Sequence, residues 1–257
     1  HYVGYSYPMS GKDRTQAWIP ERILRQYFLP PFQAGLEAGA LTVMVNSSEN
    51  NGIPSHSDDF LLKTVLRDEL GFKGFVVSDW EDVKRLHTRD RVAATPKEAV
   101  RMAVMAGIDM SMVPMDFSFY ELLLELVKEG AVPMQRIDEA VGRILRVKAL
   151  LGLFESAYPD TSLKANFACE EFESVNLEAA RESITLLKNE DRVLPLARTA
   201  KILVTGPTAH ARSVMNSGWT ITWQGDREEL YPTTKPTVLE AIRQKAGEDN
   251  VVYVPGA

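Results

Sequence analysis

The sequence predicts an α/β protein in which short parallel strands alternate with covering helices. Three short apolar runs rich in β-branched residues, 41–45, 75–77 and 108–112, are separated by longer segments with helical periodicity. Strands that are apolar on both faces are typical of a parallel sheet covered by helices. Periodicity alone leaves two architectures open, the later part of a (β/α)8 barrel and an open doubly wound sheet.

The elements expected before the second of these strands follow from prolines, glycines and caps. The first helix must break or kink at Pro30 and Pro31, because proline removes a backbone donor. The next helix has Asp58 or Asp59 as its cap and Gly71 as its stop. In order, we expect a loop over 1–20, a helix over 21–38, a strand over 41–45, a loop over 46–57, a helix from 58 or 59 to 70, and a strand over 75–77.

A capping-box pattern marks the first helix expected after that strand. Thr95 and Glu98 have the spacing of a capping box, and Pro96 stands at the first helical position, so a helix should run to about Ala106. The elements expected after it are a strand over 108–112, helices near 117–129, 134–151 and 175–188, a strand over 201–206, a helix near 235–246 and a strand near 250–254.

Loss of this pattern divides the chain into domains. Residues 155–174 are polar and lack the strand–helix alternation, so they are interpreted as a linker. The predicted organisation is a first domain over 1–155, a linker over 156–174 and the start of a second α/β domain over 175–257.

Composition excludes several classes of function. The 257 residues are 45% hydrophobic and 25% charged, close to a globular average, and the chain is long enough to bury a core. A net charge of -6 provides no basic surface for nucleic acid or for an anionic membrane, and no apolar run approaches the ~20 residues of a membrane span. We therefore expect neither nucleic acid nor a membrane as a partner.

The sequence also predicts that no metal or cofactor is bound. Cys169 is the only cysteine, which excludes an internal disulfide and a thiolate metal site. No two histidines have the i, i+4 spacing of a helical zinc site, and no G-x-G-x-x-G follows a strand. The missing phosphate loop also argues against a nucleotide-binding protein of doubly wound fold.

Polar residues at the ends of parallel strands are the candidates for chemistry, because ligands bind at that edge. Asp79 ends the strand over 75–77 and could attack the anomeric carbon of a glycoside, while Trp80 offers a flat apolar face to a sugar ring. The alternative interpretation is that Asp79 caps a helix near residue 82. Asp109 is a weaker candidate, and a buried Asp bonded to loop amides is favoured there.

Two further tryptophans, Trp219 and Trp223, lie in a segment rich in glycine and threonine. Such a composition favours a loop over a core helix. A ligand platform and core packing both remain open for this pair.

Several motifs resemble those of family 3 glycoside hydrolases. The segment KGFVVSDW over 73–80 is similar to the G-F-x-G-x-V-x-S-D-W stretch of that family. Further resemblances, in chain order, are His1 to the histidine of a Lys-His motif, 29–32 to L-P-P-F, 107–110 to G-x-D-M, 184–196 to the start of the second domain, and 218–225 to G-W-T-x-x-W-Q-G. These matches span nearly the whole chain in order.

The resemblance implies a fold, a reaction and residue roles. Family members place a (β/α)8-like barrel before an α/β sandwich, so this chain would be the C-terminal part of the barrel followed by the start of the sandwich. The implied activity is that of a retaining β-glycosidase of β-glucosidase type, with Asp79 as nucleophile and a β-glucoside or oligosaccharide as substrate. Sugar-binding roles are implied for His1, Met44, Trp80, and Trp219 or Trp223.

The resemblance is incomplete at both ends. The family's earlier sugar ligands, an Asp, an Arg and the Lys before His1, would precede this chain, and the acid/base carboxylate is expected beyond Ala257. We therefore expect the remainder of the same polypeptide to complete the site. The branch of the family that removes N-acetylglucosamine carries a motif similar to K-H-F-P-G-x-G, and the residues after His1 do not match that motif. Xylosidase or arabinosidase specificity and a non-catalytic sugar-binding relative stay open, and export is expected only because bacterial members of this type are often exported.

Overall fold

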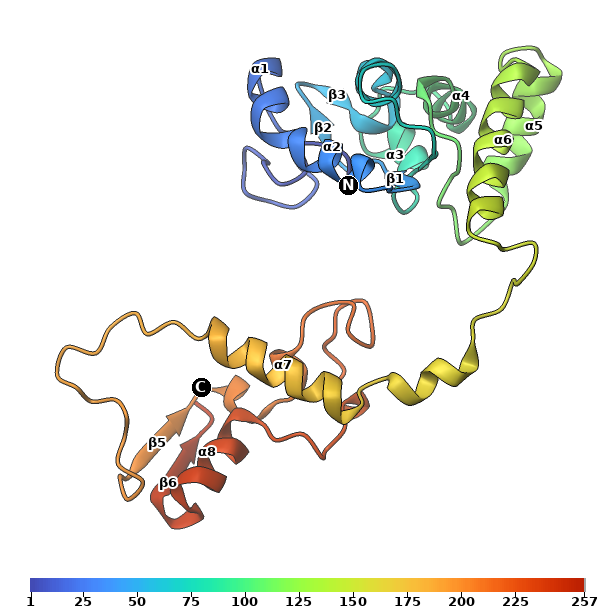
Figure 1. Ribbon diagram of the computed structural model, residues 1–257. Coiled ribbons are helices and arrows are strands. Elements are labelled where there is room, and N and C mark those ends of the chain that lie inside the picture. Colours follow the sequence, from blue (N-terminus) through green and yellow to red (C-terminus); the bar gives the residue numbers. More distant parts are fainter. Residues whose placement is uncertain (257) are drawn as a thin grey trace. The chain divides into compact units, whose positions relative to one another are not determined.

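The computed structural model describes residues 1–256, which form two compact units, His1–Thr161 and the residues from Ser162 onward (Figure 1). Each unit has its own hydrophobic cluster and is described by itself. No helix among residues 1–256 combines the length and the apolar character that crossing a membrane would require.

The first unit alternates short strands with helices. Its elements are α1 (Glu21–Ile23), η1 (Leu24–Phe28), α2 (Pro30–Glu37), β1 (Thr42–Met44), β2 (Glu49–Asn50), β3 (Ile53–Pro54), η2 (Ser55–Ser57), η3 (Phe60–Glu69), β4 (Phe75–Val77), α3 (Asp82–Thr88), α4 (Pro96–Ala106), α5 (Ser118–Lys128) and α6 (Met134–Leu150). The elements η1 and η3 are π-helical, and η2 is a 3₁₀ turn. A further 3₁₀ segment, η4 (Thr161–Asn166), lies at the boundary between the units in the sequence.

Parallel pairing of β1 and β4 positions the candidate site. Val43 is in register with Val76, and the pairing continues when Val45 N–H donates to Val77 O at 2.9 Å. Isolated parallel bridges join Tyr2 to Val45 on one side and Val77 to Met110 on the other. Four segments of chain thus run side by side, and their carboxyl ends lie at one edge.

The expected strand over 108–112 is wrong, because only the bridge at Met110 forms there. Val76 O accepts from the N–H groups of both Asp109 and Met110, while Val76 N–H donates to the Asp109 carboxylate at 2.9 Å. The Asp109 carboxylate thus accepts the backbone N–H that would donate to a carbonyl in a regular ladder. Regular pairing on this side of β4 is therefore limited to the single bridge between Val77 and Met110.

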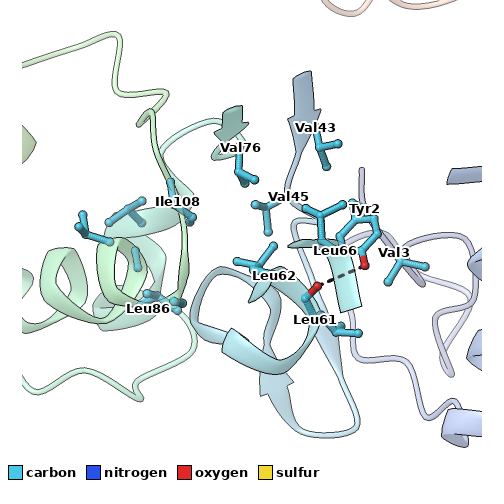
Figure 2. Packing of buried hydrophobic residues seen from close by; sticks show 14 of the residues in the cluster. Tyr2, Val3, Val43, Val45, Leu61, Leu62, Leu66, Val76, Leu86 and Ile108 are labelled. Carbon is cyan, nitrogen blue, oxygen red and sulfur yellow. Dashed lines mark hydrogen bonds between the residues drawn. The ribbon is translucent and has the colours of Figure 1, made fainter. Parts of the chain in front are cut away.

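A hydrophobic cluster beneath the strands fixes this edge. Figure 2 shows Val45 and Val76 facing Leu62 of η3, with Ile108 close by. Tyr2 is buried in the same cluster, and its hydroxyl donates to Leu61 O at 3.2 Å. Each fully buried aliphatic side chain of this kind contributes about 1.5–3 kcal/mol to stability.

Close approach of two backbones requires a glycine before β4. A Cβ on Gly74 would lie only 1.9 Å from Leu41 O, the carbonyl that precedes β1. Phe75 N–H donates to the same carbonyl at 3.3 Å. Gly74 therefore lets β4 begin directly beside β1.

Helix boundaries confirm most of the sequence signals and correct others. The helix expected over 21–38 is divided at Pro30, which begins α2. Gly71 follows η3 with a φ of 67°, as a stop signal requires. Asp58, rather than Asp59, holds the start of η3, because its Oδ1 accepts from Leu61 N–H at 3.0 Å.

Only half of the predicted capping box forms at α4. Thr95 Oγ1 accepts from Glu98 N–H at 3.1 Å, which satisfies one free donor of the first turn. The Glu98 carboxylate instead forms a two-point contact with the guanidinium of Arg101.

The second unit is smaller and more open. Its elements after η4 are α7 (Glu170–Ser183), β5 (Ile202–Thr205), η5 (Pro207–His210), η6 (Ser213–Met215), η7 (Glu228–Leu230), α8 (Val238–Ala246), η8 (Glu248–Asn250) and β6 (Val251–Val254). The strands β5 and β6 pair in parallel, and α8 packs on them through Leu239. A capping box starts α8, where Thr237 and Glu240 bond each other's backbone N–H.

Two expectations for this unit are corrected. The helix predicted near 175–188 is α7, which begins at Glu170 and ends at Ser183. The strand predicted over 201–206 as buried has only Val204 buried. Leu203 is exposed because, among the described residues, β5 is covered on one face only, by α8.

Candidate active site

Asp79 lies at the carboxyl edge of the parallel strands, directly after β4. Its carboxylate is largely buried, and the two oxygens have different surroundings. Oδ1 accepts from Trp80 N–H at 2.6 Å, and Oδ2 lies 3.3 Å from Nε2 of His1. The His1 side chain is 43% exposed, so Oδ2 adjoins a partly exposed side chain, whereas Oδ1 is bound by the backbone.

The backbone of Asp79 is held by side chains. Its N–H donates to Nε2 of His56 at 3.0 Å, and its carbonyl accepts from the Ser78 hydroxyl at 2.9 Å. Ser78 Oγ in turn accepts from Met112 N–H at 2.8 Å. Because β4 ends at Val77, these contacts replace the sheet ladder that would otherwise fix the residue.

The alternative interpretation of Asp79 as a helix cap does not hold. The helix that follows is α3, whose N-cap residue is Glu81, with a left-handed φ of 57°. The Asp79 carboxylate is engaged with Trp80 N–H and His1 instead.

His56 is a neutral imidazole beneath this carboxylate. Burial is the main cause that lowers the pKa of His56 to about 3; Asp79 opposes this shift, and Arg89 and Arg85 contribute to it. A neutral ring with Nε2 accepting must carry its proton on Nδ1. Sequence reasoning missed His56, because its contact with Asp79 joins residues far apart in the chain and leaves no local pattern.

Three more of the predicted site residues lie at the same edge. Met44 ends β1 in register with Val77 and is half-buried. His1 adjoins Tyr2, which bridges to Val45 just beyond β1, and Trp80 is 44% exposed. The structure thus brings His1, Met44, Asp79 and Trp80 to one end of β1 and β4.

Tyr5 is a neighbour that sequence reasoning also missed. Its ring lies 4.9 Å from that of His1, and its hydroxyl donates to Asp13. Burial, together with the hydrogen bond to Asp13, raises the pKa of Tyr5 to about 12. The phenol therefore stays protonated and packs against the imidazole of His1.

Trp219 and Trp223 belong to the second unit and form a tight exposed loop. Trp219 N–H donates to Thr222 O at 3.1 Å and to Trp223 O at 3.0 Å. The two residues are 79% and 62% exposed, which excludes core packing within their own unit. Gly218 permits this turn, since a Cβ there would lie 2.8 Å from Trp223 O.

Asp109 is a structural carboxylate. Arg67 approaches its Oδ2 at 2.7 Å, and Arg136 and Arg143 each approach its Oδ1 at 2.9 Å. Burial of the carboxylate is complete, and Val76 N–H adds a fourth donor. The predicted burial of Asp109 is confirmed, but the expected loop amides are replaced by one strand amide, that of Val76, and by three guanidinium groups.

Within residues 1–256, no three His, Cys, Asp or Glu side chains are grouped so that they could hold a metal ion. The side chains at the edge of β1 and β4 include the carboxylate of Asp79, the imidazole of His1 and the indole of Trp80.

Comparison with known proteins gives this arrangement a family. Residues 1–147 match the glycosyl hydrolase family 3 N-terminal domain, and residues 184–253 match the family's C-terminal domain. The chain belongs to glycosyl hydrolase family 3. The resemblance found in its motifs is therefore confirmed, and its mixed α/β fold is that of family 3 structures.

Relatives of this family 3 chain include enzymes for different sugars. It is 45% identical to a lysosomal beta glucosidase of Dictyostelium discoideum, over 100% of this chain and 32% of the relative. It is 35% identical to a beta-xylosidase of Formosa agariphila, over 96% of this chain and 35% of that protein. A crystal structure of a beta-glucosidase from Listeria innocua in complex with glucose superposes with a TM-score of 0.84 at 31% identity, covering 99% of this chain and 33% of that one. The chain spans about a third of the length of the proteins it matches.

Proposed function

We propose that this chain carries the nucleophile of a retaining β-glycosidase that releases terminal β-linked glucose, and that Asp79 is that nucleophile. The observation that carries the proposal is the carboxylate itself. It lies just beyond the carboxyl end of the parallel strand β4, with Oδ1 held by Trp80 N–H and Oδ2 turned toward half-exposed His1. Membership of family 3 and the beta-glucosidases among the relatives support the choice of sugar.

The proposed reaction is a double displacement. Asp79 Oδ2 attacks the anomeric carbon while the bond to the leaving oxygen breaks, and that oxygen takes a proton from a carboxylic acid. Water then attacks the same carbon from the opposite face and gives a proton back to that carboxylate, which cleaves the ester to Asp79 and releases the sugar with its β configuration retained. The acid must lie about 5–5.5 Å from Asp79 in such a mechanism. We propose that it is supplied from outside residues 1–256.

The sugar is proposed to be bound by the residues around Asp79. His1 would bond its hydroxyls, Met44 would pack beneath it, and Trp80 would cover a ring face. Trp219 and Trp223 are proposed to clamp the leaving-group sugar, in keeping with their exposed indoles.

The finer architecture is also a proposal. The side-by-side order of Tyr2, β1, β4 and Met110 supports the later half of a (β/α)8-like barrel over 1–155. The parallel pair β5–β6 with α8 supports the start of an α/β sandwich domain over 175–257, after a linker over 156–174 whose end overlaps the beginning of α7. Further strands from the remainder of the same polypeptide would complete the barrel. Export stays a prediction.

The stereochemical course tests the mechanism. Proton NMR of a fresh reaction with an aryl β-glucoside should show β-glucose first, with α-glucose appearing only by mutarotation. Initial release of α-glucose would contradict a nucleophilic role for Asp79. The measurement should use the longest natural form of the protein.

A β-xylosidase is the second candidate, because one of the relatives bears that name. Glucose and xylose differ by one hydroxymethyl group, so a single subsite decides between them. The ratio of kcat/KM for aryl β-glucoside and aryl β-xyloside separates the two, and a ratio above one supports the glucosidase. Binding of sugar by this protein without hydrolysis of either glycoside would instead indicate a non-catalytic sugar-binding relative.

A further inference from the structure

His56 joins the backbone of Asp79 to a second buried carboxylate, that of Asp82. Its Nε2 accepts from Asp79 N–H at 3.0 Å, and its Nδ1 lies 4.0 Å from Oδ2 of Asp82. All three residues are buried, and His56 comes from η2, on a loop remote in sequence from the other two. The imidazole therefore lies between the proposed nucleophile and a fixed negative charge.

The tautomer of His56 follows from its partners. An amide N–H can only donate, so Nε2 must be unprotonated, and the single proton of the neutral ring lies on Nδ1. That proton is directed toward the carboxylate side of Asp82. At 4.0 Å the contact is an electrostatic attraction rather than a hydrogen bond.

Asp82 is placed to hold this ring. Its Oδ1 pairs with Arg85, and Arg89 Nη1 lies 3.9 Å from the same oxygen. Its Oδ2 has no hydrogen-bond partner within residues 1–256 and faces the His56 ring. A buried carboxylate oxygen without a donor is unusual, and a ring N–H is the group nearest to supplying one.

The Asp79 peptide needs such a support. The ladder of β4 ends at Val77, so Asp79 N–H has no carbonyl across the sheet. The orientation of this short segment sets two things at once, the direction of the Asp79 side chain and the position of Trp80 N–H, which holds Oδ1. Loss of the acceptor on His56 would free both.

We propose that His56, oriented by Asp82, is a positioning residue that fixes the peptide of Asp79 and thereby aims its carboxylate at the anomeric carbon. The inference rests on the proposed function of Asp79 as nucleophile. His56 itself touches no reacting atom. Its neutral, Nδ1-protonated ring acts only through the backbone N–H of Asp79.

The test compares His56→Leu, which removes the acceptor, with His56→Gln, whose amide oxygen can replace Nε2. The probe is 2,4-dinitrophenyl 2-deoxy-2-fluoro-β-glucoside, used on the longest natural form of the protein, and each variant gives an inactivation rate constant and a half-saturation concentration. His56→Leu should lower the rate constant about 10–100-fold, because misplacing a reacting group by about 1 Å costs rates of that order. The half-saturation concentration should stay within about twofold of the value for the unchanged protein. The reason is that His56 does not touch the sugar, so binding before the reaction is unaffected. His56→Gln should recover most of the rate.

Counting adducts separates misfolding from misplacement. The rate constant is expressed per molecule that finally becomes labelled, so inactive protein does not enter it. A rate constant for His56→Leu equal to that of the unchanged protein overturns the proposal. An unchanged rate in Asp82→Asn overturns the part assigned to Asp82. Absence of any adduct on Asp79 in the unchanged protein would instead contradict the proposed function.

Neutron diffraction provides a measurement that needs no variant to fold. Crystals of the unchanged protein exchanged into deuterium oxide should show deuterium on Nδ1 of His56 and none on Nε2. Deuterium on Nε2 would mean that Asp79 N–H has no acceptor there, and the proposal would fail.

Discussion

The backbone N–H of Trp80 donates a 2.6 Å hydrogen bond to Oδ1 of Asp79, the side chain of the preceding residue. This contact gives the two carboxylate oxygens different surroundings. One is fixed by the backbone, and the other, Oδ2, faces His1 and the open edge of the strands. A carboxylate held in this way has a defined direction before any sugar arrives, which lowers the cost of reaching an attacking geometry.

Replacing Asp79 should abolish turnover of aryl β-glucosides. We expect Asp79→Ala to lower kcat by about 10⁴-fold or more, since removing a nucleophile leaves only binding and electrostatic effects. Added azide should restore part of the rate by taking the place of the carboxylate. Asp138→Ala, at an exposed position of α6, is the matched control and should leave kcat unchanged. Normal kcat in Asp79→Ala would assign the chemistry to another group.

Neutralising Asp109 should destabilise the first unit without touching the chemistry directly. Its carboxylate is fully buried and lies against three guanidinium groups, of Arg67, Arg136 and Arg143. Asp109→Asn would leave these charges uncompensated, at a cost of about 3–5 kcal/mol in the free energy of unfolding. Denaturation followed by circular dichroism measures the loss. A change below about 0.5 kcal/mol, the range of ordinary surface substitutions, would show that water already compensates these arginines.

A pair of glycines tests the close approach of β4 to β1. Gly74→Ala should destabilise the protein by about 1–3 kcal/mol or more, because its Cβ would meet Leu41 O at 1.9 Å. Gly35→Ala is the matched control: it lies within α2 with nothing near the added Cβ, and it should stabilise by about 0.5–1 kcal/mol. Equal effects of the two substitutions on the unfolding midpoint would contradict this packing.

Asp58 should make part of the stability depend on pH. Burial raises the pKa of its carboxyl above the ordinary 3.8, so the folded state binds the proton more tightly than the unfolded chain. The stabilisation that this difference in pKa provides is present below the pKa of the unfolded state and is lost as pH rises through the pKa of the folded state. Asp58→Asn keeps an acceptor for Leu61 N–H and should remove this loss. The free energy of unfolding, measured from pH 3 upward, should therefore fall less steeply with pH in the variant than in the unchanged protein. Parallel curves for the two proteins would refute the assignment.

Sequence patterns predicted the elements whose signals are local. Thr95, Pro96 and Gly71 fixed helix boundaries to within a residue or two, and the apolar runs of β1 and β4 were found with their parallel pairing. These features depend on propensity and caps, which neighbouring residues determine.

Elements that depend on distant contacts were missed or wrong. The strand near Met110 is reduced to one bridge because the Asp109 carboxylate takes the N–H of Val76. The helix α3 begins at Asp82, where a helix was considered, but its N-cap is Glu81, a non-glycine residue with positive φ, and not Asp79. Strand β5 is half-exposed because only one of its faces packs against a helix, α8, which lies more than 30 residues later in the sequence.

The site shows the same division. Asp79 and Trp80 could be proposed from the sequence because they follow an apolar strand, and the motifs around them resemble family 3. His56 could not, because its hydrogen bond to Asp79 N–H spans 23 residues and leaves no periodic trace. The guanidinium cluster around Asp109 was hidden for the same reason.

Covalent trapping is the most direct test of Asp79 as the nucleophile. A 2-deoxy-2-fluoro-β-glucoside with a good leaving group slows both steps but lessens the need for the acid, so the glycosyl ester accumulates. Peptide mass spectrometry, on this chain and on its longest natural form, should find one fluoroglucosyl group on Asp79, in the peptide that contains SDW. An adduct on another carboxylate, or sugar binding without any adduct on either form, would contradict the proposal.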